Sequence, residues 1–182
     1  MEKSDADSFS FDPRPNWYAL HTRSRHEKIV TRQLTDKGVE AFLPLRLEVH
    51  RWRDRYKKVD VPLFSGYVFV RLPSHTTAAP GARLAVLKTS GVVRLVGFGR
   101  RDTPVPDEQI ESLRRLADSK ALLEPHRFLR AGQRVKVING ALAGVEGIVV
   151  RVRNAERLVI SITPIRRAIS VELSGYEVVP IG

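Results

Sequence analysis

The residues best suited to bind a partner are cationic and alternate along one short stretch. In HRWRDRYKKVDV, the cations Arg51, Arg53, Arg55 and Lys57 alternate with Trp52, Asp54, Tyr56 and Lys58. Successive side chains of a strand point to opposite sides, so we expect the first set to form one wholly basic face of a hairpin. Rows of guanidinium and ammonium groups suit the phosphates of a nucleic acid.

Residue patterns for enzymatic chemistry are missing from the sequence. The five histidines show no metal-ligand spacing with each other or with carboxylates; they are His21, His26, His50, His75 and His126. The chain also lacks cysteine, a phosphate loop ending in Lys-Ser/Thr and a nucleophile elbow. We therefore expect a protein that is not an enzyme and that needs no metal or other cofactor.

Composition indicates a folded, basic protein. Hydrophobic residues make up 42% of the 182 residues, enough to build a core, and 31 Lys and Arg against 20 Asp and Glu give a net charge of +11. The excess lies mainly in residues 16–117, which favours a surface near a polyanion over a merely solubilising charge. The N-terminus has no apolar signal region and no run reaches 18 apolar residues, so we expect a cytoplasmic protein without a membrane segment.

Residues 16–117 have the pattern of an α+β domain that follows a flexible leader, residues 1–15. Strands are expected at residues 16–20, 39–49 with an interruption at Pro44, 62–72 and 92–96, and helices after Ser24, at 82–88 and from Asp107. Ser24 and Glu27 have the spacing of a capping box, and Asp107 is expected to cap the last helix. This order predicts one antiparallel sheet with helices packed on one side of it.

The remaining residues predict a second, all-β domain. Periodicity stops at residues 118–128, which we interpret as a linker. Five short strands with glycine turns then follow within residues 129–182, at 133–138, 147–152, 158–162, 169–173 and 177–179. Short strands at this spacing are typical of a small closed barrel.

Two motifs resemble those of one family. The segment VKVINGALAGVEGIVVRV is similar to the KOW motif, and Trp17-Tyr18, Phe42-Leu-Pro44 and PLFSGYVFV at 62–70 resemble the NGN domain of the NusG family in order and spacing. The family pattern has proline where Ser65 stands. The resemblance covers residues 16–182 and implies an NGN domain followed by an SH3-like KOW barrel.

The resemblance implies RNA polymerase as the partner. In that family an apolar patch of the NGN sheet binds the β′ clamp helices, and the domain approaches the β gate loop. Trp17, Phe64 and Tyr67 match the patch, whereas Val68 and Val70 are expected in the core. The segment from Arg83 to Lys88 lies nearest the gate-loop position. His75-Thr76-Thr77 is similar to a triplet of the RfaH paralogue but falls too early in the chain.

The resemblance also implies contact with DNA in the transcription complex. Arg23 matches a basic position that contacts DNA in RfaH, and Arg25, His26 and Lys28 extend that basic edge. Charges at the start of a helix are commonly only solvated, so the alternating arginines of residues 51–55 are the second candidate.

The KOW segment indicates a specialised paralogue. The general factor uses a phenylalanine there to bind Rho and a ribosomal protein; Ile165 stands at that position, and Arg167 is kept. Losing the aromatic ring removes much of such a contact. We therefore expect a monomeric, operon-specific elongation and antitermination factor. A housekeeping NusG and a ribosome-associated RNA-binding KOW protein remain alternatives.

The KOW segment of RfaH can also fold as a helical hairpin that masks the polymerase site. We expect strands here, because β-branched residues dominate and Gly140, Gly144, Gly147 and Pro164 oppose a helix. We further expect the apolar patch of the NGN domain to stay open.

Overall fold

The computed structural model describes residues 15–52, 55–73, 80–98, 101–119, 121–126, 128, 132–152 and 155–181. Of the expected leader it describes only Pro15, and His75-Thr76-Thr77 lies outside the described residues. The elements up to residue 118 are β1 (Asn16–Thr22), α1 (Glu27–Asp36), β2 (Ala41–Phe42), β3 (Leu45–Trp52), β4 (Arg55–Pro62), β5 (Tyr67–Leu72), α2 (Pro80–Leu87), β6 (Val92–Leu95), β7 (Gly97–Phe98), β8 (Arg101–Asp102), β9 (Pro104–Val105) and α3 (Asp107–Asp118).

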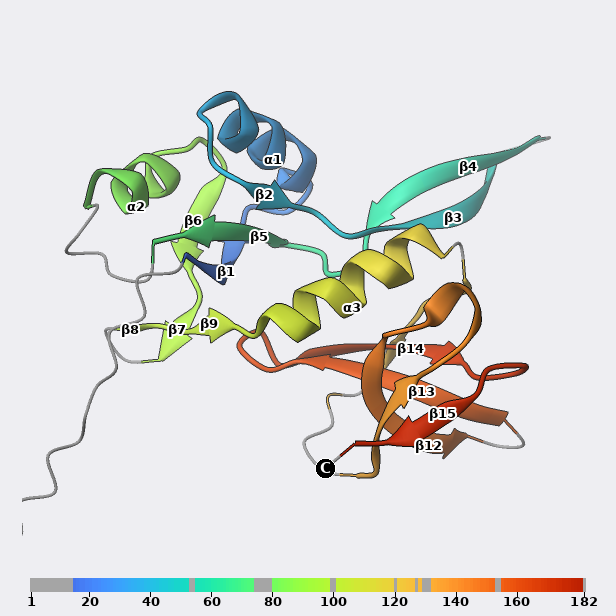
Figure 1. Ribbon diagram of the computed structural model, residues 1–182. Coiled ribbons are helices and arrows are strands. Elements are labelled where there is room, and N and C mark those ends of the chain that lie inside the picture. Colours follow the sequence, from blue (N-terminus) through green and yellow to red (C-terminus); the bar gives the residue numbers. More distant parts are fainter. Residues whose placement is uncertain are drawn as a thin grey trace, which may run out of the picture.

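The first sheet is antiparallel and has the strand order β2-β5-β1-β6, with β9 also pairing with β1. Helices α1 and α2 lie on one side of it and α3 on the other (Figure 1). Alternation along the strands explains both layers: Tyr18 and Leu20 of β1 point to α1 and α2, whereas Trp17 and Ala19 point to α3. The expected antiparallel sheet is confirmed. The expectation that the helices pack on one side is wrong, because α3 covers the opposite face.

Strands β3 and β4 form a separate two-stranded hairpin that projects from the body of the molecule (Figure 1). Its base is held by a hydrogen bond of 2.9 Å from Leu63 N–H to the carbonyl oxygen of Pro44. A second bond joins it to α1, because Lys28 Nζ donates to the backbone oxygen of Asp60 at 2.7 Å. The hairpin is thus fixed relative to α1.

The C-terminal sheet is antiparallel with the order β10-β14-β13-β12-β11-β15. Its strands and one 3₁₀ turn are β10 (Glu124–His126), β11 (Arg134–Val137), η1 (Gly140–Leu142), β12 (Glu146–Val152), β13 (Ala155–Ile162), β14 (Arg167–Glu172) and β15 (Val178–Pro180). Five of these strands were expected. The sixth, β10, forms within the stretch interpreted as a linker, where Leu123 is also buried. Strands, not helices, therefore make up the described part of this segment.

Two clusters of apolar side chains hold the chain together. The first, between the first sheet and helices α1 and α2, contains Leu20, Val30, Leu34 and Val68 among its fully buried members. The second, which we call the shared core, runs from the opposite face of that sheet through α3 into the C-terminal sheet. The fully buried side chains of Ile110, Leu113 and Leu116 place α3 at its centre.

Both predicted side-chain caps are wrong. Helix α1 begins at Glu27 after His26, and α3 begins at Asp107 after Pro106; neither end has a side-chain capping bond. The backbone of Arg25, with φ 63°, turns the chain before α1. Glu27 therefore cannot reach back in a capping box and instead points into the protein, where it is 5% exposed.

Candidate functional site

The turn before β5 is built by backbone bonds and one buried carboxylate. Gly66 has φ 82°, a left-handed conformation that favours glycine, and its carbonyl oxygen accepts from Thr22 N–H at 2.8 Å. Its own N–H donates to Glu27 Oε1 at 2.6 Å. The start of α1, the end of β1 and the turn that carries Phe64 are thereby joined.

Aromatic side chains of this turn and the adjacent strands form the face that was expected to be open. Phe64 and Phe69 meet edge to face with ring centroids 6.3 Å apart, and the rings of His21 and Tyr67 lie 5.4 Å apart. Phe64 and Trp17 are only 5% and 3% exposed, and both belong to the shared core. The expectation of an open apolar patch is therefore wrong for the intact chain; Tyr67 alone of the three is half-buried.

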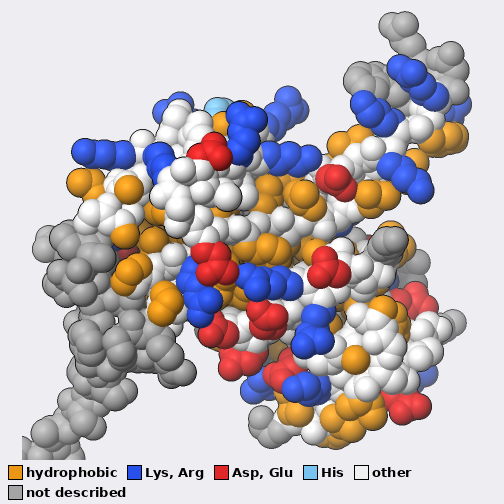
Figure 2. Space-filling model, turned by 45° about the horizontal axis from the view of Figure 1, so that its top comes forward, with side chains coloured by type: hydrophobic (Ala, Val, Ile, Leu, Met, Phe, Trp, Pro, Cys, Tyr) orange, Lys and Arg blue, Asp and Glu red, His pale blue; other side chains and the backbone are white. Residues whose placement is uncertain are grey.

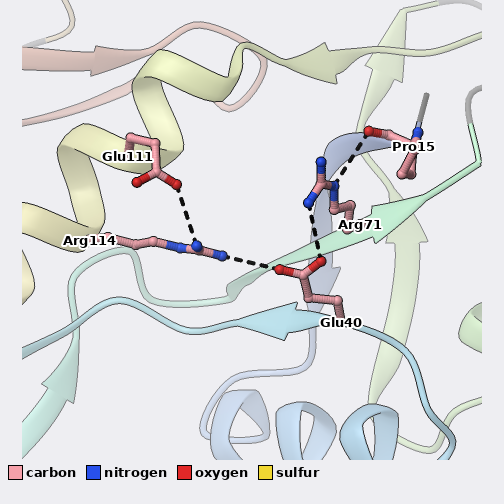
Figure 3. A network of polar contacts seen from close by, with 5 residues as sticks. All are labelled: Pro15, Glu40, Arg71, Glu111 and Arg114. Carbon is pink, nitrogen blue, oxygen red and sulfur yellow. Dashed lines mark hydrogen bonds and ion pairs between the residues drawn. The ribbon is translucent and has the colours of Figure 1, made fainter.

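Charged side chains form a network at the edge of this face (Figure 3). The guanidinium of Arg114 lies 5.2 Å from the centroid of the Trp17 ring and 5.4 Å from that of Phe42. Glu40 accepts from Arg114 at 3.2 Å and pairs with Arg71 at 3.5 Å, and Arg71 also lies 6.0 Å from the Trp17 ring. The network joins α3 to the first sheet through two cation–π contacts.

The two predicted contacts on and after α2 have different surroundings. Arg83 forms a two-pronged ion pair with Asp102 of β8, with Nε to Oδ2 at 2.8 Å and Nη2 to Oδ1 at 3.2 Å. The hydrogen bonds to Asp102 raise the pKa of Arg83, which favours its charged form. Lys88, just after the helix, is exposed. Arg83 thus joins α2 to β8, while Lys88 faces solvent.

The basic edge beside α1 lies largely at the surface. Arg23 and Arg25 are exposed, whereas His26 is half-buried with Nδ1 3.0 Å from the carbonyl oxygen of Ser24. Lys28 is also exposed, although its ammonium is used by the bond to Asp60 described above. Lys and Arg side chains gather over this part of the molecule and along the hairpin (Figure 2).

The prediction of one wholly basic face on the hairpin is wrong, because the pairing of β3 with β4 places the predicted cations on opposite faces. Arg51 lies opposite Tyr56, and the Trp52 position lies opposite Arg55. Cross-strand partners share a face, so Arg51 is on one face and Arg55 and Lys57 are on the other. Alternation within one strand does not continue through the turn between two strands. Arg53 lies outside the described residues.

Contacts between α3 and the C-terminal sheet were not predicted. Gln109, Ser112 and Arg115, spaced three apart on α3, face that sheet. Arg115 Nη1 donates to the carbonyl oxygen of Ala143 at 2.8 Å, and the Ser112 hydroxyl accepts from Glu146 N–H at 3.2 Å. The available sequence signal was only the polar residues at a spacing of three on this helix.

The two candidate partner residues of the C-terminal segment differ in exposure because of the same interface with α3. Ile165 is 7% exposed and belongs to the shared core, so the structure corrects its expected role as a surface contact in the intact chain. Its turn is tied to α3, because Thr163 N–H donates to Gln109 Oε1 at 3.4 Å. Arg167, in contrast, is exposed.

Within the described ranges, no group of three His, Asp or Glu side chains is arranged to hold a metal ion. The helices in that part of the chain are also too short or too polar to cross a membrane. What the structure does display is an α+β sheet domain with a basic edge and a projecting hairpin, joined through α3 to an all-β sheet.

Comparison with known proteins identifies the family. Residues 15–114 match the family model described as NusG, transcription termination factor. The transcription termination/antitermination protein NusG of Pseudomonas aeruginosa is 29% identical over 89% of this chain and 96% of its own length. The Deinococcus radiodurans protein of the same name is 32% identical over 73% of this chain and 81% of its own. The chain belongs to the NusG family of transcription termination and antitermination proteins.

A solved structure agrees with the fold. The structure described as showing a domain interaction in Thermotoga maritima NusG superposes with a TM-score of 0.52 at 22% identity. It covers 90% of this chain and 97% of the other. At that identity the similarity concerns the fold, which includes both the first sheet and the C-terminal sheet.

Proposed function

We propose that this chain is a specialised elongation and antitermination factor that binds RNA polymerase through residues 16–117 and suppresses pausing or termination on particular operons. Family membership supports the general role. The observation that carries the specialised role is Ile165: an aliphatic side chain, buried in the shared core, stands where the family resemblance implies an exposed phenylalanine. A bacterial factor of this kind acts in the cytoplasm, where polymerase works.

The polymerase contact is assigned to the aromatic face around the turn at residues 63–66. Tyr67 is half-buried beside His21 and is the member of the face best able to meet the β′ clamp helices. Phe64 and Trp17 support it from the shared core and become contacts only if that core opens. The exposed Lys88 is the candidate for the β gate loop, whereas Arg83 is occupied by Asp102.

Nucleic acid in the transcription complex is assigned to the basic edge and the hairpin. Arg23 and Arg25 are exposed beside the start of α1, and Lys28 links this edge to the hairpin. Neutralising several phosphates in this way supplies affinity that depends on salt and not on sequence. The hairpin contributes Arg51 on one face and Arg55 on the other.

The C-terminal segment, residues 129–182, is assigned as a KOW domain that closes against α3 in the isolated chain. Its candidate partner residues, Ile165 and Arg167, differ in exposure, so only Arg167 is available without opening. The similarity to general NusG proteins over most of the chain favours a second candidate, a housekeeping factor that couples polymerase to Rho and the ribosome.

The deciding experiment combines two measurements on purified components. Capture of RNA polymerase by the intact chain tests the general role, and a Rho-dependent RNA release assay tests the specialised one. We expect polymerase to be captured and Rho-dependent release to be unchanged or reduced. Increased release would assign the housekeeping role. Sedimentation with ribosomes and no capture of polymerase would contradict both and indicate a ribosome-associated protein.

A further inference from the structure

One face of the hairpin β3–β4 carries large exposed side chains. The strand register places Leu47, Val49 and Arg51 of β3 on the same face as Tyr56, Lys58 and Asp60 of β4. We call this the tyrosine face. The side chains of Leu47, Val49 and Tyr56 are 57%, 61% and 73% exposed. A ring left this open, on an element that projects from the body, is positioned to contact a partner (Figure 1).

Cations flank the ring on its own face. Tyr56 lies directly opposite Arg51 across the hairpin, and such cross-strand partners have Cβ atoms about 5 Å apart. Lys58 follows two residues later in the same strand, on the same face, and lies opposite Val49. Tyr56 therefore shares its face with an arginine across the hairpin and a lysine two residues along the strand.

The charge around the ring favours a polyanion over a protein surface of mixed charge. Residues 50–58 contain five Lys and Arg and one acid, Asp54, which lies outside the described residues. Two carboxylates lie nearer the base. Asp60 is on the tyrosine face opposite Leu47, and Glu48 is on the other face, where it is paired with Arg46 and His50. The distal half of the tyrosine face is thus cationic.

An exposed aromatic ring between cations suits unpaired bases. A base stacks on such a ring only when it is free of its own duplex neighbours, while the cations hold the adjoining phosphates. In a duplex the bases are already stacked on one another, so the Tyr56 ring would add nothing to the affinity, and only the neighbouring cations would contribute. An exposed ring beside cations therefore favours a single strand over a duplex.

We infer that the tyrosine face binds single-stranded nucleic acid, with Tyr56 stacking on a base and with Arg51 and Lys58 holding phosphates. The inference rests on the proposed function only in placing the chain near nucleic acid in a transcription complex. It names the strand type and the residue that recognises it.

The test uses the intact chain and fluorescein-labelled 12-residue oligonucleotides of deoxythymidine and of uridine, with a 12-base-pair DNA duplex as the third probe. Fluorescence anisotropy should show that Tyr56→Ala weakens binding to a single strand by roughly 5- to 150-fold, the range found for base–aromatic stacking. Binding to the duplex should stay within about twofold. Tyr56→Phe, which keeps the ring, should bind single strands like the wild type.

Two matched controls accompany the test. Val49→Ala truncates an exposed side chain of the same face without removing a ring and should have little effect. For single strands, Lys58→Gln should make the slope of log affinity against log salt concentration shallower by about 0.7, the value for one lost phosphate contact. Arg151→Gln, in the C-terminal sheet, should leave this slope unchanged. Tighter binding to one of the two single strands would tell RNA from DNA as the ligand.

Other outcomes would overturn the inference. Equal losses for single strands and duplex in Tyr56→Ala would mean that the ring does not stack. Absence of any oligonucleotide binding, with Tyr56→Ala and Val49→Ala both weakening capture of RNA polymerase, would assign the face to a protein contact. Failure of the proposed function is separate, because it would leave oligonucleotide binding intact while polymerase is not captured.

Discussion

Glu27 Oε1 accepts a hydrogen bond of 2.6 Å from the backbone N–H of Gly66, which joins the first residue of α1 to the turn before β5. The carboxylate is almost fully buried, so its side chain has exchanged water for this contact. The same turn carries the aromatic residues assigned to the polymerase contact. The position of that site therefore depends on a residue that lies on another element.

Replacing Glu27 should destabilise the fold. Because hydrogen bonds to a charged group contribute about 1.5–3 kcal/mol, Glu27→Ala should lower the free energy of unfolding by that amount. Glu27→Gln keeps an acceptor oxygen and should cost about 1 kcal/mol. Urea denaturation measures both. Wild-type stability of the alanine variant would contradict this account of the turn.

Substitutions at Tyr67 and Phe64 should distinguish a loss of polymerase binding from a loss of fold stability. Tyr67→Ala removes a half-buried ring and should abolish capture of RNA polymerase while the chain stays folded. Phe64→Ala empties a site in the shared core and should cost about 3–5 kcal/mol of stability as well. Polymerase capture and chemical denaturation of each variant test the distinction. Wild-type capture by folded Tyr67→Ala would remove the site from this face.

The contact between Arg115 and Gly144 should control how firmly the C-terminal sheet holds α3. Gly144 has φ 89°, and a Cβ there would lie 2.9 Å from Cζ of Arg115. Gly144→Ala should therefore cost about 1 kcal/mol or more through backbone strain and displacement of the arginine. In Arg115→Ala the second part is already absent, so the double variant should be more stable than the sum of the two losses predicts. Strictly additive losses would contradict the coupling.

The basic edge should reveal phosphate contacts through salt. Arg23→Glu and Arg25→Glu should each weaken association with a paused transcription complex and reduce the slope against salt by about one unit per lost contact. Lys28→Glu should also lower stability, because it breaks the bond to the backbone oxygen of Asp60. An unchanged slope in the first two variants would leave the hairpin as the nucleic-acid contact.

Stability at high pH should depend on Tyr18. Burial raises the pKa of Tyr18, with a smaller opposing effect of a hydrogen bond to Asn16. The unfolded chain then loses the phenolic proton at lower pH than the folded one, so this group destabilises the fold as pH rises above about 10. Below that pH its contribution is complete. Tyr18→Phe should show a shallower decline in unfolding free energy between about pH 9 and 11. Equal declines would contradict it.

Elements with a clear period could be predicted, and contacts between elements could not. The period of three in Ile110, Leu113 and Leu116 identified α3 because a helix buries one stripe of residues. Nothing local shows that α3 is covered on two sides, so the burial of Ile165 and the covering of Phe64 were missed.

The hairpin shows the same limit at the scale of single residues. An extended hairpin was predicted, but its turn and its faces were not, because the cross-strand register decides which arginines share a side. Glu27 is a third case: its spacing from Ser24 fits a cap, and the left-handed backbone at Arg25 redirects it to Gly66.

The two sides of the shared core are synthesised at different times. A ribosome makes the first sheet and α3 before any strand of the C-terminal sheet, and 64 residues follow Asp118. At roughly 5–20 residues per second, α3 lacks its second layer for about 3–13 s of synthesis. During that interval the nascent chain exposes the apolar side of α3 that the finished protein buries under the C-terminal sheet.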